Sequence, residues 1–418
     1  MAYVEVYGME RRSLATLCAA VVCFWMFALA FGTAQGAGLA VDPQPADAVL
    51  VSAPAAEAAT AATEVLDLNC RAAILIEQHS GQVLYEMNAD EAVPVASITK
   101  VMTLLLTFEA LHAGKLTLDT PVPVSEHTAS MGGSQIWLEP GEYFTLDEMI
   151  RAICIRSAND AAVAVAELVG GSEPGFVAQM NARAAELGMV HTHFDNACGL
   201  DKAGHVSTAR EVAVMSREIL NTCPEVLQYT STWSTTLRGG ATEIINTNKL
   251  LKTYSGTTGL KTGTTGKAGV CITASATRDG LDLIAVVLGA PSSADRFNSA
   301  ITLLDYGFGH YAAVSLPDLE QQPLQLTVKG SAEPSVPLDY SALPATVLVE
   351  KGAEGSVRCE LTLPEEMAAP VQKGQIVGQV AVYTGDTLAG EYAVKAAADA
   401  PALTLKTAME LLWNSLLA

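Results

Sequence analysis

Basic residues are scarce in this sequence. Its 418 residues include 24 Lys and Arg against 45 Asp and Glu, which gives a formal net charge of −21 at pH 7. Nucleic acids and anionic lipid surfaces attract cationic proteins, so this balance argues against a nucleic-acid-binding protein and against electrostatic recruitment to a membrane. The chain is nevertheless long enough for two domains with a large hydrophobic core.

Metal-binding cysteine pairs are also lacking. Of the 8 cysteines, two lie in an N-terminal apolar segment, and none of the others follows a Cys-x-x-Cys spacing. These others are Cys70, Cys154, Cys198, Cys223, Cys271 and Cys359. The sequence therefore predicts no zinc site and no cofactor. Cys154 and Cys271 lie in apolar runs, which favours buried free thiols there. Disulfide pairing among the rest stays open, because spacing does not define connectivity.

The N-terminus has the composition of a secretory signal. Arg11 and Arg12 precede an apolar run over residues 14–31, and small residues follow. This order predicts a signal peptide over residues 1–36, cleaved near Gly36 or Ala40. The run is long for a signal and short for a membrane span, so a retained anchor stays an alternative. Residues 37–64 are rich in Ala and Pro and are interpreted as a linker.

The apolar stretch after Pro94 is the clearest prediction of a buried helix. Residues 101–111 are apolar nearly all round, and Pro94 and Gly114 supply start and stop signals. Ser97 and Lys100 stand at its beginning, and their spacing of three places both side chains on one helical face. A lysine in a water-poor site loses its charge more easily and can take the proton of a serine. Ser97 is thus a candidate nucleophile and Lys100 its general base, although an isolated Ser-x-x-Lys match is weak.

Two further motifs, each present once, strengthen this signal. Ser157-x-Asn159 follows a predicted helix, and Lys261-Thr262-Gly263 lies in a predicted strand. The three motifs in this order are typical of penicillin-recognising serine acyl transferases. Ser157 is expected to pass a proton to the leaving amine, and the charge of Lys261 is expected to assist this transfer. Asn159 is expected to bind a substrate amide and to hold the lysine of the first motif.

The strand motif has the chemistry of a peptide-binding edge. Lys261 attracts a substrate carboxylate and Thr262 offers it a hydroxyl, while Gly263 is expected to let the strand approach a bound peptide closely. The peptide would add to the strand edge through backbone hydrogen bonds. The N–H groups of Ser97 and Thr264 are the expected oxyanion donors. Two neighbouring cations are also expected to lower the pKa of one lysine.

The remaining pattern predicts an α+β domain over residues 65–312. Residues 72–77 and 82–85 form a predicted β-hairpin, and Thr145 and Glu148 form a capping box that opens a helix. Further helices are expected over residues 161–168, 176–187 and 208–220, and the pattern changes to strands after residue 248, with runs over 259–265, 270–276 and 283–288. Strands at both ends with helices between them favour one antiparallel sheet shared by the terminal segments.

Beyond residue 313 short alternating runs and prolines predict a second domain. The runs at residues 324–328, 345–349, 357–363 and 379–383 favour a small all-β sandwich over residues 313–397. Residues 398–418 form a predicted amphipathic tail helix, with Leu405, Ala408, Met409, Leu412 and Leu416 on one face. The helix is too short to cross a bilayer, and contact with the membrane interface is favoured over docking on the β domain.

Residues 65–311 resemble the low-molecular-mass penicillin-binding proteins, in particular the serine-type D-alanyl-D-alanine carboxypeptidases. The resemblance rests on the three motifs and on residues 94–100, 133–134, 157–162, 180–181, 187–189, 246–250, 259–263 and 296–297. It implies a penicillin-binding, β-lactamase-like domain followed by the β domain and the tail helix. It also implies hydrolysis of the terminal D-alanine of peptidoglycan stem peptides, and acylation of Ser97 by β-lactams. The implied location is the periplasm or the outer face of the cytoplasmic membrane, with peripheral anchoring. Arg296 is the implied ligand of the terminal carboxylate, and a surface or domain-boundary salt bridge is the alternative.

Other activities use similar motifs. A β-lactamase needs a deacylating water held by a glutamate and an asparagine; Glu218 and Asn221 have this composition but are interpreted as the solvated face of an ordinary helix. A D,D-endopeptidase uses the same residues, and a non-catalytic penicillin sensor predicts a broken motif, whereas all three are intact. Thr258 replaces an acidic residue that the family often has before Gly259, which affects strand-end contacts. Asp160 is expected to bond nearby backbone.

Overall fold

One antiparallel sheet joins the two ends of the N-terminal domain. The computed structural model describes residues 65–316 and 323–417, and the predicted signal peptide and linker lie outside them. Five strands pair in the order β2-β1-β9-β8-β7. They are β1 (Ala72–Glu77), β2 (Val83–Met87), β7 (Thr257–Thr265), β8 (Gly269–Arg278) and β9 (Leu281–Ala290). The predicted sharing of one sheet by the terminal segments is confirmed, and β7 forms an edge of this sheet.

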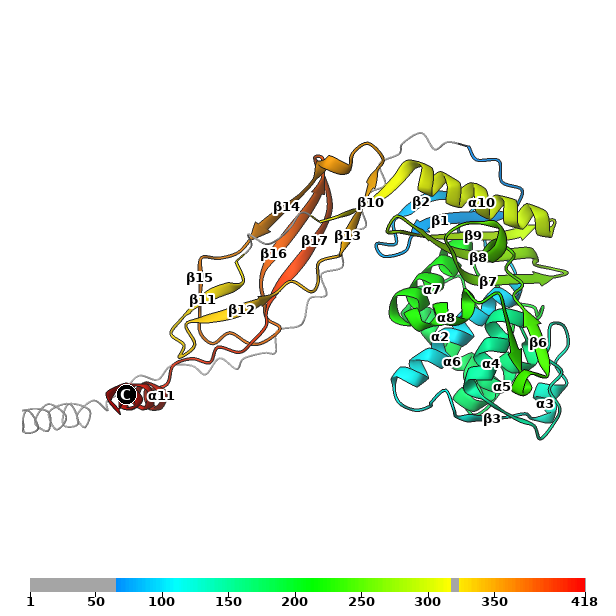
Figure 1. Ribbon diagram of the computed structural model, residues 1–418, viewed down its shortest axis with the longest axis horizontal. Coiled ribbons are helices and arrows are strands. Elements are labelled where there is room, and N and C mark those ends of the chain that lie inside the picture. Colours follow the sequence, from blue (N-terminus) through cyan, green and yellow to red (C-terminus); the bar gives the residue numbers. More distant parts are fainter. Residues whose placement is uncertain (1–64, 317–322, 418) are drawn as a thin grey trace, which may run out of the picture. The chain divides into compact units, whose positions relative to one another are not determined.

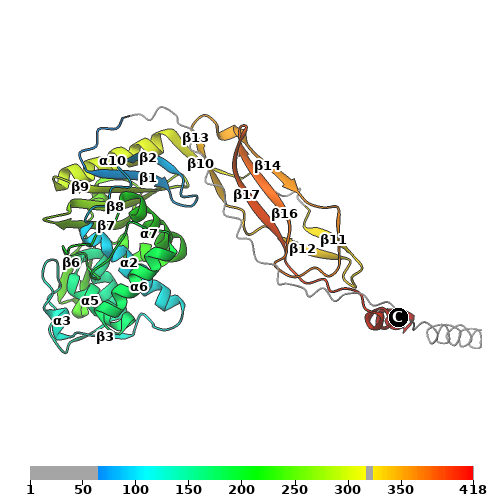
Figure 2. The same cartoon turned by 180° about the vertical axis from the view of Figure 1, so that it is seen from behind.

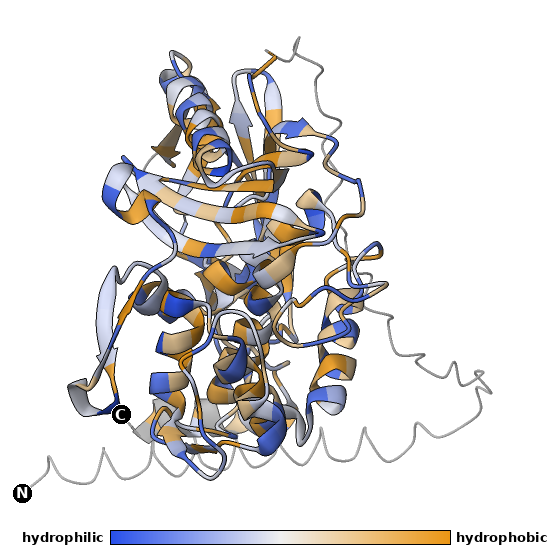
Figure 3. Ribbon diagram, turned by 90° about the vertical axis from the view of Figure 1, so that its right-hand side faces the viewer, coloured by the Kyte–Doolittle hydropathy of each residue, from blue (hydrophilic) through white to orange (hydrophobic). Residues whose placement is uncertain are grey.

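Helices cover both faces of the sheet (Figures 1 and 2). Successive side chains of β1 point to opposite faces of the sheet. Ile74 therefore packs with the helical cluster, and Leu75 packs with α10 (Ser293–His310). Figure 3 shows bands of apolar residues (orange) along the strands. The sequence pattern misses α10, since glycines weaken a helix prediction. Gly307 is nevertheless useful there, because a Cβ would lie 2.5 Å from the side chain of Leu283 on β9.

The helical cluster holds most of the hydrophobic core. Its main helices are α2 (Lys100–His112), α4 (Leu146–Arg151), α5 (Asn159–Gly170), α6 (Glu173–Glu186) and α7 (Ala209–Thr222). Shorter pieces are α3 (Glu126–Ala129), α8 (Leu227–Thr230), α9 (Leu250–Thr253), the 3₁₀ turns η1 (Ala96–Thr99), η3 (Pro224–Val226) and η4 (Arg238–Gly240), and the π-helical turn η2 (Ala152–Arg156). Two hairpins accompany them, β3 (Pro121–Pro123) with β4 (Tyr143–Thr145) and β5 (Ser234–Leu237) with β6 (Thr242–Ile245).

Most of the expected helices are confirmed. The three expected helices after residue 160 correspond to α5, α6 and α7, and the capping box opens α4, where Thr145 Oγ1 accepts from Glu148 N at 3.2 Å. The expected change from helices to strands after residue 248 comes too late, since β5 and β6 precede that point. Only two of their eight residues are buried, so they give little periodic signal. In the described part of the chain no single helix is long and apolar enough to cross a membrane, and α5 and α6 meet that test only as a pair bent by 82°.

The C-terminal domain is all β, as predicted. A six-stranded sheet has the order β14-β16-β17-β12-β11-β15, and β10 pairs with β13. The strands are β10 (Tyr311–Ser315), β11 (Gln325–Lys329), β12 (Ser335–Asp339), β13 (Thr346–Glu350), β14 (Val357–Thr362), β15 (Glu366–Ala368), β16 (Ile376–Thr384) and β17 (Thr387–Ala396), with a 3₁₀ turn η6 (Glu354–Ser356). The sequence pattern misses β12, which contains Pro337, and β17, which contains Gly390, because proline and glycine weaken a strand prediction.

The tail helix α11 (Leu405–Leu417) exposes its apolar side chains. The exposed fractions of Leu405, Met409, Leu412, Trp413 and Leu416 lie between 63% and 80%. Contact of this helix with a membrane surface or with the β domain stays a prediction. Helix α11 begins a few residues later than the predicted tail segment.

The cysteines of the described residues are free thiols. Cys154 and Cys271 are buried, as predicted, and Cys198 and Cys223 are buried as well. Burial raises the pKa of Cys154 to about 12 and that of Cys271 to about 11. Both thiols therefore stay protonated and unreactive at neutral pH.

Candidate active site

Ser97 and Lys100 meet at the junction of η1 and α2. Lys100 Nζ donates to Ser97 Oγ at 2.9 Å, to Asn159 Oδ1 at 2.6 Å and to Cys198 O at 2.7 Å. Lys100 is fully buried, whereas Ser97 is half-buried. Burial lowers the pKa of Lys100 to about 8, so a useful fraction of this amine is neutral near neutral pH.

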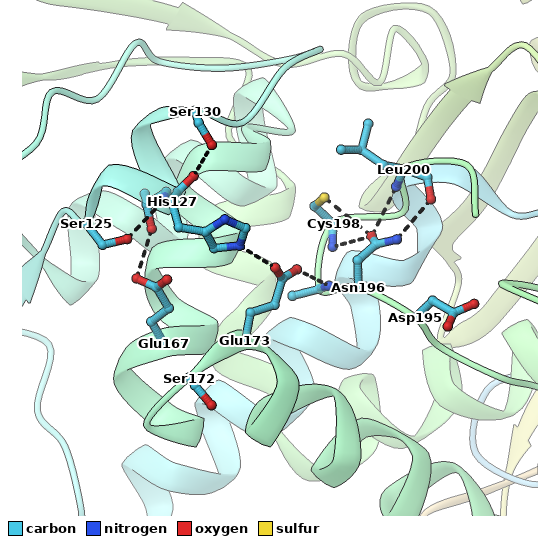
Figure 4. Close-up of polar contacts among 12 residues, drawn as sticks. Ser125, His127, Ser130, Glu167, Ser172, Glu173, Asp195, Asn196, Cys198 and Leu200 are labelled. Atoms are coloured by element: carbon cyan, nitrogen blue, oxygen red, sulfur yellow. Dashed lines mark hydrogen bonds and ion pairs between the residues drawn. The ribbon is translucent and has the colours of Figure 1, made fainter. Parts of the chain in front are cut away.

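The loop over residues 195–200 supplies the third acceptor of Lys100, Cys198 O. Figure 4 shows the hydrogen bonds that Asn196 and Glu173 make to this loop. Asn196 Oδ1 accepts the backbone N–H groups of residues 198–200 at 2.6 to 3.2 Å. Glu173, in the first turn of α6, accepts another N–H of the same loop at 3.1 Å. Sequence motifs do not reveal this loop, because it contacts the lysine through a backbone carbonyl.

Ser157 and Asn159 lie in the predicted helix-to-helix turn. The π-helical turn η2 ends at Arg156, and Ser157, which caps it, has a left-handed φ of 62°. Such a backbone is costly for serine and is common at functional sites. Asn159 begins α5, and its Nδ2 donates to Gly132 O at 2.7 Å while its backbone N donates to Ser134 O at 2.7 Å. These bonds fix the amide so that its oxygen faces Lys100.

Lys261 extends from β7 to Ser157. Its Nζ donates to Ser157 Oγ at 2.7 Å and to Thr262 O at 2.8 Å. Lys261 is almost completely buried, and burial, followed by the charge of Lys100, lowers its pKa well below the usual value. Thr262 Oγ1 lies 2.6 Å from Thr247 Oγ1. Thr247 is absent from the predicted site, although the Asn-Thr-Asn segment that contains it is one of the family-like segments.

Gly263 packs against the segment that carries the nucleophile. A Cβ at this position would lie 2.9 Å from Ser97 N and 3.0 Å from Val95 O. No side chain tolerates such contacts, so glycine is required for β7 to lie against η1. This close approach is to the protein's own backbone. It also places Ser97 N beside the residue that precedes Thr264. The expected approach of a bound peptide to the strand stays a prediction.

Arg296 lies on α10 behind β7. Its Nη1 donates to the carbonyls of Gly263 and Cys271 at 3.4 and 3.3 Å, and its Nη2 donates to Ser293 Oγ at 3.2 Å. The alternative of a surface or domain-boundary salt bridge is wrong, since Arg296 is buried and has no acidic partner among the described residues. Burial lowers its pKa to about 10, and its Nε lacks a hydrogen-bond partner in this part of the chain. Thr264, by contrast, is exposed.

Asp160 has the structural role expected for it. Its carboxylate accepts the N–H groups of Ile136, Leu138 and Ala161 at 2.9 to 3.2 Å. These bonds tie the segment before α4 to the start of α5. Thr258, where the family often has an acidic residue, donates to Ser275 Oγ at 2.8 Å and makes a neutral strand-end contact.

Glu218 and Asn221 are engaged elsewhere on α7. Glu218 pairs with Arg183 at 2.6 Å, and Asn221 Oδ1 accepts from Gln78 Nε2 at 3.2 Å. Both belong to an ordinary helix, as interpreted from the sequence, and their side chains are held by these partners. The structure therefore gives no support to a deacylating water at this pair.

One group of side chains in the described part of the chain has the composition of a metal site. It consists of His112, Cys223 and Glu225. His112 Nε2 and Glu225 Oε1 lie 2.5 Å apart, which is a direct hydrogen-bond contact. Two ligands of one zinc ion, each about 2 Å from it, would be separated by roughly 3.3 Å. The group therefore does not support a metal centre.

The chain matches two known domain families in sequence. The D-alanyl-D-alanine carboxypeptidase family, peptidase S11, matches residues 57–292, and the C-terminal domain of penicillin-binding protein 5 matches residues 321–402. D-alanyl-D-alanine carboxypeptidase DacF of Bacillus subtilis (strain 168) is 40% identical over 341 residues, which cover 81% of this chain and 87% of that protein.

Solved structures show the same relationship. Penicillin binding protein 5 from Haemophilus influenzae matches with a TM-score of 0.69 and 26% identity, over 81% of this chain and 99% of that one. Penicillin-binding protein D2 from Listeria monocytogenes, solved in its ampicillin-bound form, matches with a TM-score of 0.55 and 34% identity, over 59% of this chain and 100% of that one. With the family match covering more than half of its residues, the chain belongs to the D-alanyl-D-alanine carboxypeptidase family of low-molecular-mass penicillin-binding proteins.

Proposed function

We propose that Ser97 is the nucleophile of a serine-type D-alanyl-D-alanine carboxypeptidase and that Lys100 is its general base. The carrying observation is the buried hydrogen-bond network in which Lys100 Nζ joins Ser97 Oγ to Asn159 Oδ1, while Lys261 Nζ bonds Ser157 Oγ. Membership of the family supplies the substrate class, the D-Ala-D-Ala end of a peptidoglycan stem peptide.

The reaction divides into two steps of acyl transfer. Ser97 Oγ attacks the carbonyl of the penultimate D-alanine and gives its proton to Lys100. The N–H groups of Ser97 and Thr264 bind the oxyanion of the tetrahedral intermediate. The C–N bond then breaks, and the amine of the leaving D-alanine takes a proton through Ser157. Water hydrolyses the acyl-enzyme in the second step and restores the serine.

Three residues are suited to the terminal carboxylate of the substrate. Lys261 and Arg296 are buried cations that donate to neutral oxygens among the described residues, and buried charge without a counter-charge is unfavourable. A carboxylate would supply the missing negative charge and raise the pKa of both groups. Thr262, held by Thr247, would donate a hydroxyl to it. Because β7 is an edge strand, the peptide backbone would add alongside it.

D-alanine release tests this function. The protein without residues 1–36 is expected to release D-alanine from diacyl-L-Lys-D-Ala-D-Ala and to form one covalent adduct with fluorescent penicillin. Peptide mapping by mass spectrometry is expected to locate the adduct on Ser97. Acylation without release would favour the sensor or endopeptidase alternatives. Rapid turnover of penicillin would favour a β-lactamase, and absence of any adduct would refute the assignment.

The substrate also indicates where the protein acts. Peptidoglycan lies outside the cytoplasmic membrane, so the protein acts in the periplasm or at the cell surface, in keeping with the predicted signal peptide. We propose that α11 anchors it peripherally, because its apolar side chains are exposed and form one face. The domain limits 65–312, 313–397 and 398–418 remain our proposal, and β10 spans the first boundary.

Removal of residues 405–418 is expected to abolish membrane binding without changing D-alanine release. Lys406 is the only cation of this segment, so binding should depend on apolar burial and respond weakly to salt. Co-sedimentation with anionic phospholipid vesicles at low and high salt measures both properties. Equal sedimentation of the full and shortened proteins would rule out α11 as the anchor.

A further inference from the structure

The peptide group before the nucleophile is held by a chain of buried hydrogen bonds. Thr99 Oγ1 donates to Ala96 O at 2.8 Å, and His205 Nε2 lies 2.7 Å from Thr99 Oγ1. Asp195 N donates to His205 Nδ1 at 3.0 Å. Thr99 is completely buried and His205 is 3% exposed. The chain therefore runs from the loop that holds Lys100 to the residue that precedes Ser97.

The direction of each proton in this chain is determined. The single hydroxyl proton of Thr99 goes to Ala96 O, so His205 must donate from Nε2. Its Nδ1 carries the lone pair that accepts the Asp195 N–H. Only the neutral tautomer with a proton on Nε2 satisfies both contacts. Burial lowers the pKa of His205 to about 4, which keeps this form populated at neutral pH.

The held carbonyl fixes the Ser97 N–H. The Ala96–Ser97 peptide bond is trans and planar, so its C=O and N–H point in opposite directions. Ala96 has a left-handed φ of 51°, which is unfavourable for alanine and needs support from its surroundings. Gly199 packs against the same carbonyl, since a Cβ there would lie 1.9 Å from Ala96 O. The opposite end, Ser97 N, faces Gly263 of β7.

We propose that Thr99 and His205 are positioning residues that aim the Ser97 N–H at the oxyanion of the tetrahedral intermediate. Neither touches the substrate; they act through the Ala96 carbonyl. The inference rests on the proposed function, in which Ser97 N and Thr264 N form the oxyanion hole. The new element is that one of the two oxyanion donors, Ser97 N, is held in place through the loop over residues 195–200. The same loop positions the general base, Lys100.

The matched variants Thr99→Val and Thr99→Ser test this proposal. Valine keeps the shape of threonine but removes the hydroxyl, whereas serine keeps the hydroxyl. Loss of one oxyanion donor costs about 100- to 1,000-fold in other enzymes, so a misdirected donor is expected to cost about 10- to 100-fold. We expect Thr99→Val to lower the acylation rate constant for penicillin by this factor with an unchanged dissociation constant of the initial complex, and Thr99→Ser to act like the parent.

Two further readouts separate positioning from a general structural defect. A boronic acid analogue of the D-alanine end forms a tetrahedral adduct on serine, and Thr99→Val should weaken its binding by the same factor as acylation. The rise of acylation with pH, which is governed by Lys100, should stay in place. His205→Leu should behave like Thr99→Val, and His205→Gln, which retains an N–H donor, should recover part of the rate.

The proposal is overturned if Thr99→Val acylates as fast as Thr99→Ser. It is also overturned if both variants slow alike, or if the loss appears only in the dissociation constant. Failure of the proposed function is distinguishable, because the parent protein itself would then form no penicillin adduct or would release no D-alanine.

Discussion

Ser97→Ala is expected to release no D-alanine and to form no covalent adduct with penicillin, a loss of about 10⁴-fold or more. No described serine other than Ser97 bonds to Lys100, so no second hydroxyl is placed to replace it. Steady-state release of D-alanine from diacyl-L-Lys-D-Ala-D-Ala measures the loss, and fluorescent penicillin followed by gel electrophoresis measures the adduct.

The same variant is expected to keep its fold. Ser97 contributes one acceptor to the Lys100 ammonium, which retains Asn159 Oδ1 and Cys198 O when the hydroxyl is removed. Circular dichroism and the thermal midpoint should therefore match those of the parent. Ser130→Ala is a suitable control, since this exposed serine bonds only the nearby His127 carbonyl and lies outside the site. An adduct on Ser97→Ala would show that another residue is the nucleophile.

The elements with strong periodicity are predictable from the sequence, and the others are not. α5 and β9 are continuous apolar runs, and the capping box of α4 has a local signature, so all three agree with expectation. α10 is held largely by tertiary packing, in which Gly307 lets it approach the sheet. Local propensity carries little information about such contacts. The β5–β6 hairpin is not predicted for a different reason. Few of its residues are buried, so its sequence lacks a clear alternation of apolar residues.

In the active site, the side chains are predictable from the sequence and the backbone features are not. Three short motifs identify Ser97, Lys100, Ser157, Asn159 and Lys261, and the structure brings these side chains into one network. A residue pattern does not reveal the backbone features of the site. These are the carbonyl of Cys198 and the left-handed backbone at Ser157 and Ala96. They depend on how distant segments pack. Sequence therefore identifies the reacting groups, while the fold determines how they are aimed.

Lys100→Met is expected to slow acylation by about 100- to 10,000-fold, the usual contribution of a general base. Methionine resembles lysine in length and suits a buried position but cannot accept a proton. Stopped-flow measurement of penicillin acylation gives the rate constant directly. Lys115→Met, at an exposed lysine beyond the C-terminal end of α2, whose first residue is Lys100, is the matched control and should react like the parent. A normal rate for Lys100→Met would show that Lys261 or another group is the base.

The pH dependence identifies the base independently. Lys100 acts as a base only in its neutral form, and its pKa is lowered to about 8. The neutral fraction rises from about one tenth at pH 7 to about nine tenths at pH 9, so acylation of the parent should rise about tenfold over this interval. The rise is lost in Lys100→Met and kept in Lys115→Met. A rise of equal size in Lys100→Met would assign the titration to another group, with Lys261 as the first to examine, because its pKa is lowered as well.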